Sequence, residues 1–108
     1  MLDKSSINLI YLQNSGLTHN DLKKIFPTKE DFDPIHMWEG LLEGNMKLDI
    51  NTDRFEKIQK KAKEIDAEKV EKFLKEKEVD IVSWYDIRYP SKMKNIRHAP
   101  FLFSVRGT

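Results

Sequence analysis

The spacing of apolar residues predicts helices along the first three quarters of the chain. Apolar residues recur three or four positions apart in three short segments, at residues 7–12, 19–26 and 35–42. Because helices this short are unstable alone, we expect the three to pack against one another. The expected contacts join residues of the third segment to residues of the first two: Trp38, Leu41 and Leu42 with Ile7, Ile10 and Phe26.

Candidate capping residues indicate where these helices begin. Ser5 or Ser6 is expected to cap the first helix, because a hydroxyl side chain accepts a hydrogen bond from a free backbone N–H group. Thr18, followed three residues later by Asp21, is a candidate capping box for the second helix. Pro34 suits the first turn of the third helix, where its missing N–H group is not needed.

The segment at residues 52–77 contains neither Gly nor Pro, but its apolar face changes direction. Apolar residues at 55–65 share one face of a helix, and those at 70–74 share a second face rotated by roughly a quarter turn. Asp66 lies at the join and is a good N-cap residue. The pattern therefore predicts two helices, with the break within two residues of Asp66.

In the last quarter of the chain the apolar pattern becomes that of strands. Residues 79–84 and 101–105 are nearly continuously apolar and rich in β-branched or aromatic side chains, as expected of strands buried on both faces. The order of elements predicts a mainly α protein. A helical domain would occupy residues 1–78, and residues 79–108 would form two short strands that begin an α/β domain.

Charge is distributed unevenly, although the net charge is only +1. Residues 1–53 carry a net charge of −4 and residues 54–80 a net charge of +1, whereas residues 81–108 carry +4 with Asp86 as the single acid. A contact with a polyanion is therefore expected near the C-terminal end. Surface charge that keeps a protein in solution explains the same distribution.

No residue pattern indicates catalysis, a cofactor or a metal. The chain has no cysteine, and His19, His36 and His98 lie far apart without spaced partners. We therefore expect a protein that is not an enzyme. Residues 1–16 lack the long apolar core of a secretory leader, and no stretch approaches the roughly 20 apolar residues that span a bilayer. These features favour a cytoplasmic protein without a membrane partner.

The stretch NSGLTHNDLKKIF, residues 14–26, is a local pattern with a binding chemistry. A turn at Gly16 followed by a helix start presents backbone N–H groups, and Lys23 and Lys24 lie within reach of an anion held there. Helix-hairpin-helix units hold a phosphate backbone in this way. An ordinary turn between helices, with both lysines in solvent, explains the same residues.

The end of the chain, VDIVSWYDIRYPSKMKNIRHAPFLFSVRGT, resembles a segment of the DNA-processing protein A family (DprA, also called Smf). In that family a buried strand, an Asp-x-x-Tyr-Pro turn, a short helix and a Pro-hydrophobic strand precede an Arg-Gly or Lys-Gly pair. The opening, INLIYLQNSGLTHNDLKKIF, is similar to the family's short helical domain, described as sterile-alpha-motif-like (SAM-like) or helix-hairpin-helix-like. The residues that match family motifs at the end of the chain are Asp86, Tyr89, Pro90, Arg106 and Gly107.

The resemblance implies a role in DNA processing. The family's larger, Rossmann-like domain binds single-stranded DNA, and its Gly-Ser-Arg loop would follow soon after Gly107. The chain is therefore expected to be an N-terminal fragment of a protein that binds incoming single-stranded DNA. That protein would help to load the strand-exchange recombinase during natural transformation, so recombinase or other competence proteins are implied partners.

Basic residues are the expected DNA contacts of the fragment itself: Lys23, Lys24, Arg88 and Arg106, around the stackable ring of Tyr89. The family-motif residues are expected to be mainly structural. Asp86 would form an Asx-type turn, Pro90 would fix the corner, and Tyr89 would pack with its hydroxyl group hydrogen-bonded. The alternative is a protein-interaction or spacing module that does not bind DNA and uses acidic residues: Asp31, Asp33, Glu39 and Glu43.

Overall fold

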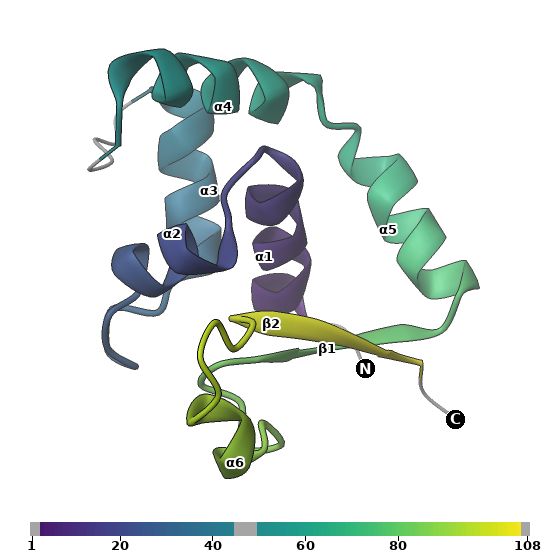
Figure 1. The fold of residues 1–108 in the computed structure, drawn as a ribbon. Coiled ribbons are helices and arrows are strands. Elements are labelled where there is room, and N and C mark those ends of the chain that lie inside the picture. Colours follow the sequence, from purple (N-terminus) through teal and green to yellow (C-terminus); the bar gives the residue numbers. More distant parts are fainter. Residues whose placement is uncertain (1–2, 45–49, 107–108) are drawn as a thin grey trace.

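The chain is mainly helical, as the apolar spacing predicts (Figure 1). The computed structural model describes residues 3–44 and 50–106. Within these residues the chain forms six helices and two strands: α1 (Lys4–Asn14), α2 (His19–Ile25), α3 (Pro34–Glu43), α4 (Thr52–Glu64), α5 (Ala67–Glu76), β1 (Val79–Ser83), α6 (Ser91–Lys94) and β2 (Leu102–Arg106). No helix in the described part of the chain is long and apolar enough to cross a membrane.

Side-chain caps fix the starts of the helices. In the capping box of α2, the backbone N–H of Thr18 donates to the Asp21 carboxylate at 2.8 Å, and the N–H of Asp21 donates to the Thr18 hydroxyl at 3.2 Å. This prediction is confirmed. The prediction that Ser5 or Ser6 caps α1 is wrong, because the carboxylate of Asp3 accepts from the N–H of Ser6 at 2.8 Å. The helix therefore starts earlier in the chain.

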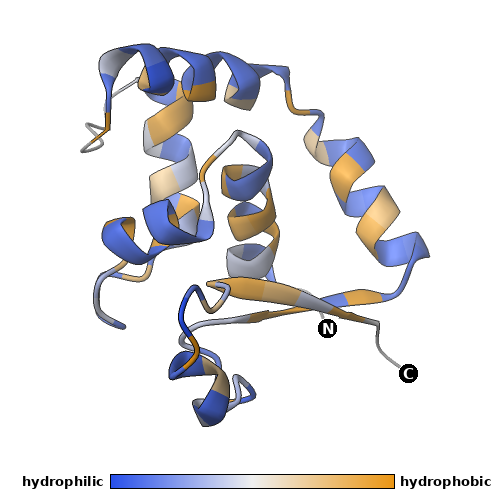
Figure 2. Cartoon of the chain, viewed as in Figure 1, coloured by the Kyte–Doolittle hydropathy of each residue, from blue (hydrophilic) through white to orange (hydrophobic). Residues whose placement is uncertain are grey.

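The long polar segment is divided into α4 and α5, as its two apolar faces predict. α4 ends at Glu64, Ile65 has an extended backbone, and the carboxylate of Asp66 caps α5 by accepting from the N–H of Lys69 at 3.2 Å. The break lets α4 contact α1 and α3 while α5 contacts β1. Figure 2 shows that hydrophilic residues cover most of α4.

One hydrophobic cluster holds the helices and the strands together. Leu9 and Leu12 of α1 are fully buried in it. Its buried members are spread along the chain: Leu9, Tyr11, Leu12, Leu17, Leu22, Phe26, Trp38, Leu41, Ile58, Ala62, Ile81, Phe101 and Leu102. Ile7, Ile10 and Leu42 pack against it partly buried, so the expected contact set lies in one core.

The two strands pair antiparallel, from Val79 opposite Arg106 to Ser83 opposite Leu102. β1 is buried over its second half, but the end of β2 is not, since Val105 is 40% exposed. The expectation that both strands are buried on both faces is therefore wrong for β2. At the C-terminal end of β2, the helices lie on one side of the hairpin only (Figure 1).

An ion pair joins α4 to the start of α2. The guanidinium of Arg54 donates to both carboxylate oxygens of Asp21, with 3.0 Å between Nη1 and Oδ1. It also donates to the carbonyl of Gly16 at 3.5 Å. The Asp21 side chain is nearly buried, and the hydrogen bonds from Arg54 lower its pKa to about 2 against the opposing effect of burial. The pair fixes α4 against the α1–α2 turn.

We predict that Trp38→Ala destabilises the protein by about 3–5 kcal/mol. Trp38 is 7% exposed and its ring lies 5.2 Å from that of Tyr11, centroid to centroid. A loss of this size is a large fraction of the roughly 5–15 kcal/mol that stabilises a typical domain. Denaturant unfolding measures it, with Ile87→Ala as control because Ile87 is 99% exposed. An unchanged unfolding midpoint for Trp38→Ala would contradict the packing described here.

We also predict that Arg54→Ala costs about 1–3 kcal/mol at neutral pH, because it leaves a nearly buried carboxylate unpaired. The folded pKa of Asp21 lies below its ordinary value of 3.8. The pair therefore stabilises the fold fully above about pH 4, and its contribution is lost as the pH falls toward about 2.

Acid unfolding measures this dependence. Arg54→Ala should flatten it, whereas the exposed control Lys57→Ala on the same helix should keep it. Equal acid sensitivity in the two variants would show that another carboxylate is responsible.

Candidate functional site

The Asp-x-x-Tyr-Pro segment forms a tight turn after β1. Oδ1 of Asp86 accepts from the backbone N–H of Arg88 at 2.9 Å, which is an Asx-type turn. The buried Tyr89 donates its hydroxyl to the carbonyl of Pro100 at 2.5 Å. Pro90, with φ −62°, precedes the short helix α6. These contacts join the two ends of the connection between β1 and β2.

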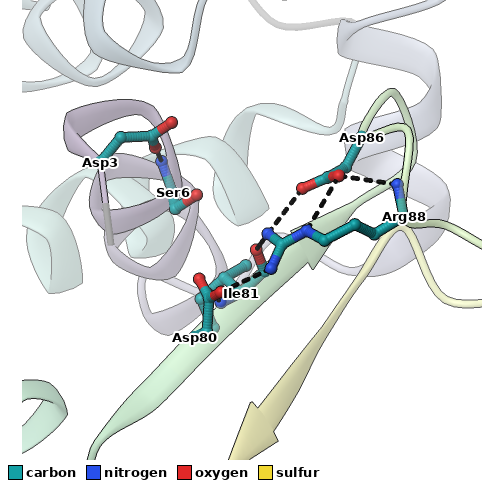
Figure 3. A network of polar contacts seen from close by, with 6 residues as sticks. All are labelled: Asp3, Ser6, Asp80, Ile81, Asp86 and Arg88. Carbon is teal, nitrogen blue, oxygen red and sulfur yellow. Dashed lines mark hydrogen bonds and ion pairs between the residues drawn. The ribbon is translucent and has the colours of Figure 1, made fainter. Parts of the chain in front are cut away.

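The side chain of Arg88 is half exposed, but its guanidinium is bonded to residues of β1 and of this turn (Figure 3). Its guanidinium donates to the carboxylate of Asp80 at 2.5 Å, to that of Asp86 at 2.8 Å and to the carbonyl of Ile81 at 3.1 Å. Hydrogen bonds from Arg88 lower the pKa of both carboxyl groups. Because two carboxylates already balance its charge, Arg88 contributes mainly to the structure of the turn.

The α1–α2 turn differs from a phosphate-binding turn. The N–H groups of Thr18 and Asp21 are already bonded within the capping box, and the carbonyl of Gly16 accepts from Arg54. The Asp21 carboxylate also places a negative charge at the start of α2. An anion held at this turn would have to displace these contacts. Lys23 and Lys24 lie in the last turn of α2.

Lys23 instead approaches the ring of Trp84. Its Nζ lies 4.9 Å from the ring centroid, and Nζ of Lys94, on α6, lies 5.2 Å from the same centroid and 5.7 Å from that of Tyr89. The rings of Trp84 and Tyr89 are 5.2 Å apart. Among the described residues, neither lysine forms an ion pair. We call Trp84, Lys23 and Lys94 the basic-aromatic cluster.

The other expected DNA contacts lie elsewhere. Lys24 is exposed on α2, next to Lys23 in the chain. The backbone of Arg106 pairs with Val79, at the end of the hairpin far from the Ser83–Leu102 pair that precedes Trp84. The step from Leu102 to Arg106 along β2 is four residues, which is about 13 Å. Gly107 lies outside the described residues.

The sequence did not identify Trp84 or Lys94 as part of a site. The available signal was the run after Asp86, which contains no acid. The missing information was tertiary, because Lys23 belongs to a helix far away in the chain. Only the packing of the hairpin on α1 and α2 brings the three side chains together.

The acidic residues expected for a protein-interaction module lie in α3 and just before it. Asp33 caps α3 by accepting from the N–H of His36 at 3.1 Å, and Asp31 accepts from the hydroxyl of Thr28 at 2.8 Å. Glu39 and Glu43 are exposed on α3. At least two of the four therefore have local structural roles. Within the described ranges no three histidine or acidic side chains gather to hold a metal ion.

His19 connects α2 to the hairpin beside the basic-aromatic cluster. Its Nδ1 accepts a hydrogen bond from the backbone N–H of Phe101 at 3.0 Å. Burial lowers the pKa of His19 below its ordinary value of 6.5, and the positive charge of Lys23 lowers it further. Protonation of Nδ1 would remove the acceptor that Phe101 uses.

Comparison with known proteins yields no match, whether to family models, to curated proteins or to solved structures. The likeness to the DNA-processing protein A family therefore depends on the residues quoted above.

We predict that the protein becomes less stable as the pH falls through 6.5 toward the lower folded pKa of His19. The unfolded chain binds this proton more readily, so the contribution is complete above about pH 7 and declines below it. Thermal unfolding at about pH 7.5 and 5.5 measures the effect.

Asparagine at position 19 offers an acceptor oxygen near the place of Nδ1 but does not titrate. His19→Asn should therefore be much less sensitive over this range, and His36→Asn, at an exposed position, should behave as the wild type. The prediction fails when all three proteins lose stability equally.

Proposed function

We propose that the chain is the N-terminal part of a DprA/Smf-like protein and serves as an auxiliary contact for single-stranded DNA. The observation that carries this proposal is the basic-aromatic cluster, in which two lysines without ion pairs meet at a half-buried Trp84. Proteins that bind single strands combine positive charge with aromatic rings in this way. The family motif from Asp86 to Pro90, described above as a turn, is consistent with it.

The whole protein would act in the cytoplasm, by binding rather than by chemistry. A Rossmann-like domain that begins with residues 79–108 would carry the principal DNA site beyond them, and β1 and β2 would lead into its sheet. Incoming single-stranded DNA would be its ligand, and the strand-exchange recombinase or other competence proteins its partners. These proposals rest on the family resemblance of the residues quoted above.

The charges limit how tightly the fragment can bind. Lys23 and Lys94 are the cations at the Trp84 ring and form no ion pair within the described residues, whereas Arg88 is balanced by two carboxylates. Affinity rises with the number of phosphates that are neutralised, and few are neutralised here. The fragment is thus an auxiliary site and not the main one.

A protein-interaction or spacing module is the second candidate function. The net charge of −4 over residues 1–53 favours it, with Glu39 and Glu43 exposed on α3. Such a module would bind a basic partner and would not bind DNA. The measurement below separates the two functions.

We predict micromolar or weaker binding of residues 1–108 to a fluorescent oligothymidylate near physiological salt. The log–log salt slope should be shallower than about −3, taking roughly −0.7 for each neutralised phosphate. Replacing both Lys23 and Lys94 by Ala should weaken binding and reduce the slope by about 1.4. The double variant Lys60→Ala/Lys63→Ala, at two exposed positions on α4, removes the same two charges elsewhere.

Two outcomes would contradict this proposal. Nanomolar binding would make the helical part the primary DNA site. The absence of binding even at low salt would leave the interaction module as the better description.

A further inference from the structure

We infer that Trp84 is a stacking platform for one nucleobase of a single strand, and that Lys23 and Lys94 bind the phosphates on either side of that base. The inference rests on the proposed function and names the ligand group that the site would take. It assigns different roles to the three members of the cluster: the ring binds the base, and the two ammonium groups bind the backbone.

Contacts with neighbouring residues of the hairpin hold Trp84 in place. Its backbone N–H donates to the carbonyl of Phe101 at 2.7 Å, next to the end of the β1–β2 pairing. Its ring lies at 53° to that of Tyr89, and the carbonyl of Pro100 fixes the Tyr89 hydroxyl. A ring supported in this way loses little conformational freedom when a base stacks on it.

The two lysines can exchange their contact with the indole ring for a contact with a phosphate. Each ammonium group lies about 5 Å from the centroid of the indole ring, 4.9 Å for Lys23 and 5.2 Å for Lys94. A cation–π contact at an exposed site contributes about two- to fivefold to an equilibrium, whereas stacking of one base contributes about fivefold to more than a hundredfold. Because no described carboxylate holds either lysine, both are available to phosphates. Binding of a base therefore gives up two weak cation–π contacts, and base stacking together with two new phosphate contacts replaces them.

The ligand of this cluster is a single strand, because the faces of bases within a duplex already stack on their neighbours. The three side chains offer a ring and two cations. These can bind a base and its phosphates without hydrogen bonds to the edges of the base. We therefore expect binding that tolerates different base sequences.

An abasic strand tests the inference, because it keeps the phosphates and lacks the bases. Residues 1–108 are titrated with an oligothymidylate of about 12 nucleotides, within the range of known single-strand sites, and with an abasic strand of equal length. The wild type should bind the oligothymidylate about tenfold more tightly than the abasic strand. Trp84→Leu should bind both with the weaker affinity, and Trp84→Phe, which keeps a ring, should retain most of the difference.

Tryptophan fluorescence gives a second readout that needs no destabilising variant. Trp38 is buried, so quenching by the oligothymidylate but not by the abasic strand would report on Trp84. Trp84→Phe should lose this quenching. Lys63→Ala should behave as the wild type in both measurements.

The outcomes separate this inference from the proposed function. Equal wild-type affinity for the two strands, without selective quenching, would overturn base stacking while leaving electrostatic DNA binding in place. A tenfold preference that survives in a folded Trp84→Leu would show that another residue stacks and would also overturn it. No binding to either strand at low salt would overturn both proposals.

Discussion

The burial of Phe101 is the contact on which the rest of the structure depends. This residue precedes β2 and is fully buried. Its ring lies 6.0–6.1 Å, centroid to centroid, from three others: Phe26, Phe32 and Tyr85. Its backbone N–H donates to His19, and its carbonyl accepts from Trp84. A single buried residue thus joins the second helix, the loop before α3 and both strands.

The position of the candidate site follows from that contact. Phe101 fixes Trp84 through its carbonyl and α2 through His19, so it sets the distance between the tryptophan ring and Lys23. The turn from Asp86 to Tyr89 then directs the chain into α6, which carries Lys94. The site is consequently a product of the packing between hairpin and helices.

Local features were predictable from the sequence, and long-range pairs were not. The capping box of Thr18 and Asp21 and the helix break at Asp66 depend on residues within a few positions of each other, so periodicity and capping chemistry identified them. The ion pair between Asp21 and Arg54 and the meeting of Lys23 with Lys94 depend on how helices cross. Arg88 illustrates the limit, since its charge indicated a DNA contact while two nearby carboxylates engage it in the turn.

The bonding of Arg54 and Arg88 to carboxylates limits how a binding surface here could hold phosphate. Arg54 and Arg88 have guanidinium groups suited to bidentate phosphate recognition, but both are bonded to carboxylates that hold the fold together. The cations left beside Trp84 are lysines, which bind phosphate as mobile point charges with little geometric selectivity. Electrostatics alone would then give weak attraction to any polyanion. Under the proposed function, discrimination in favour of a single strand would come from the aromatic ring, because a duplex offers the lysines the same phosphates but does not offer the ring a base.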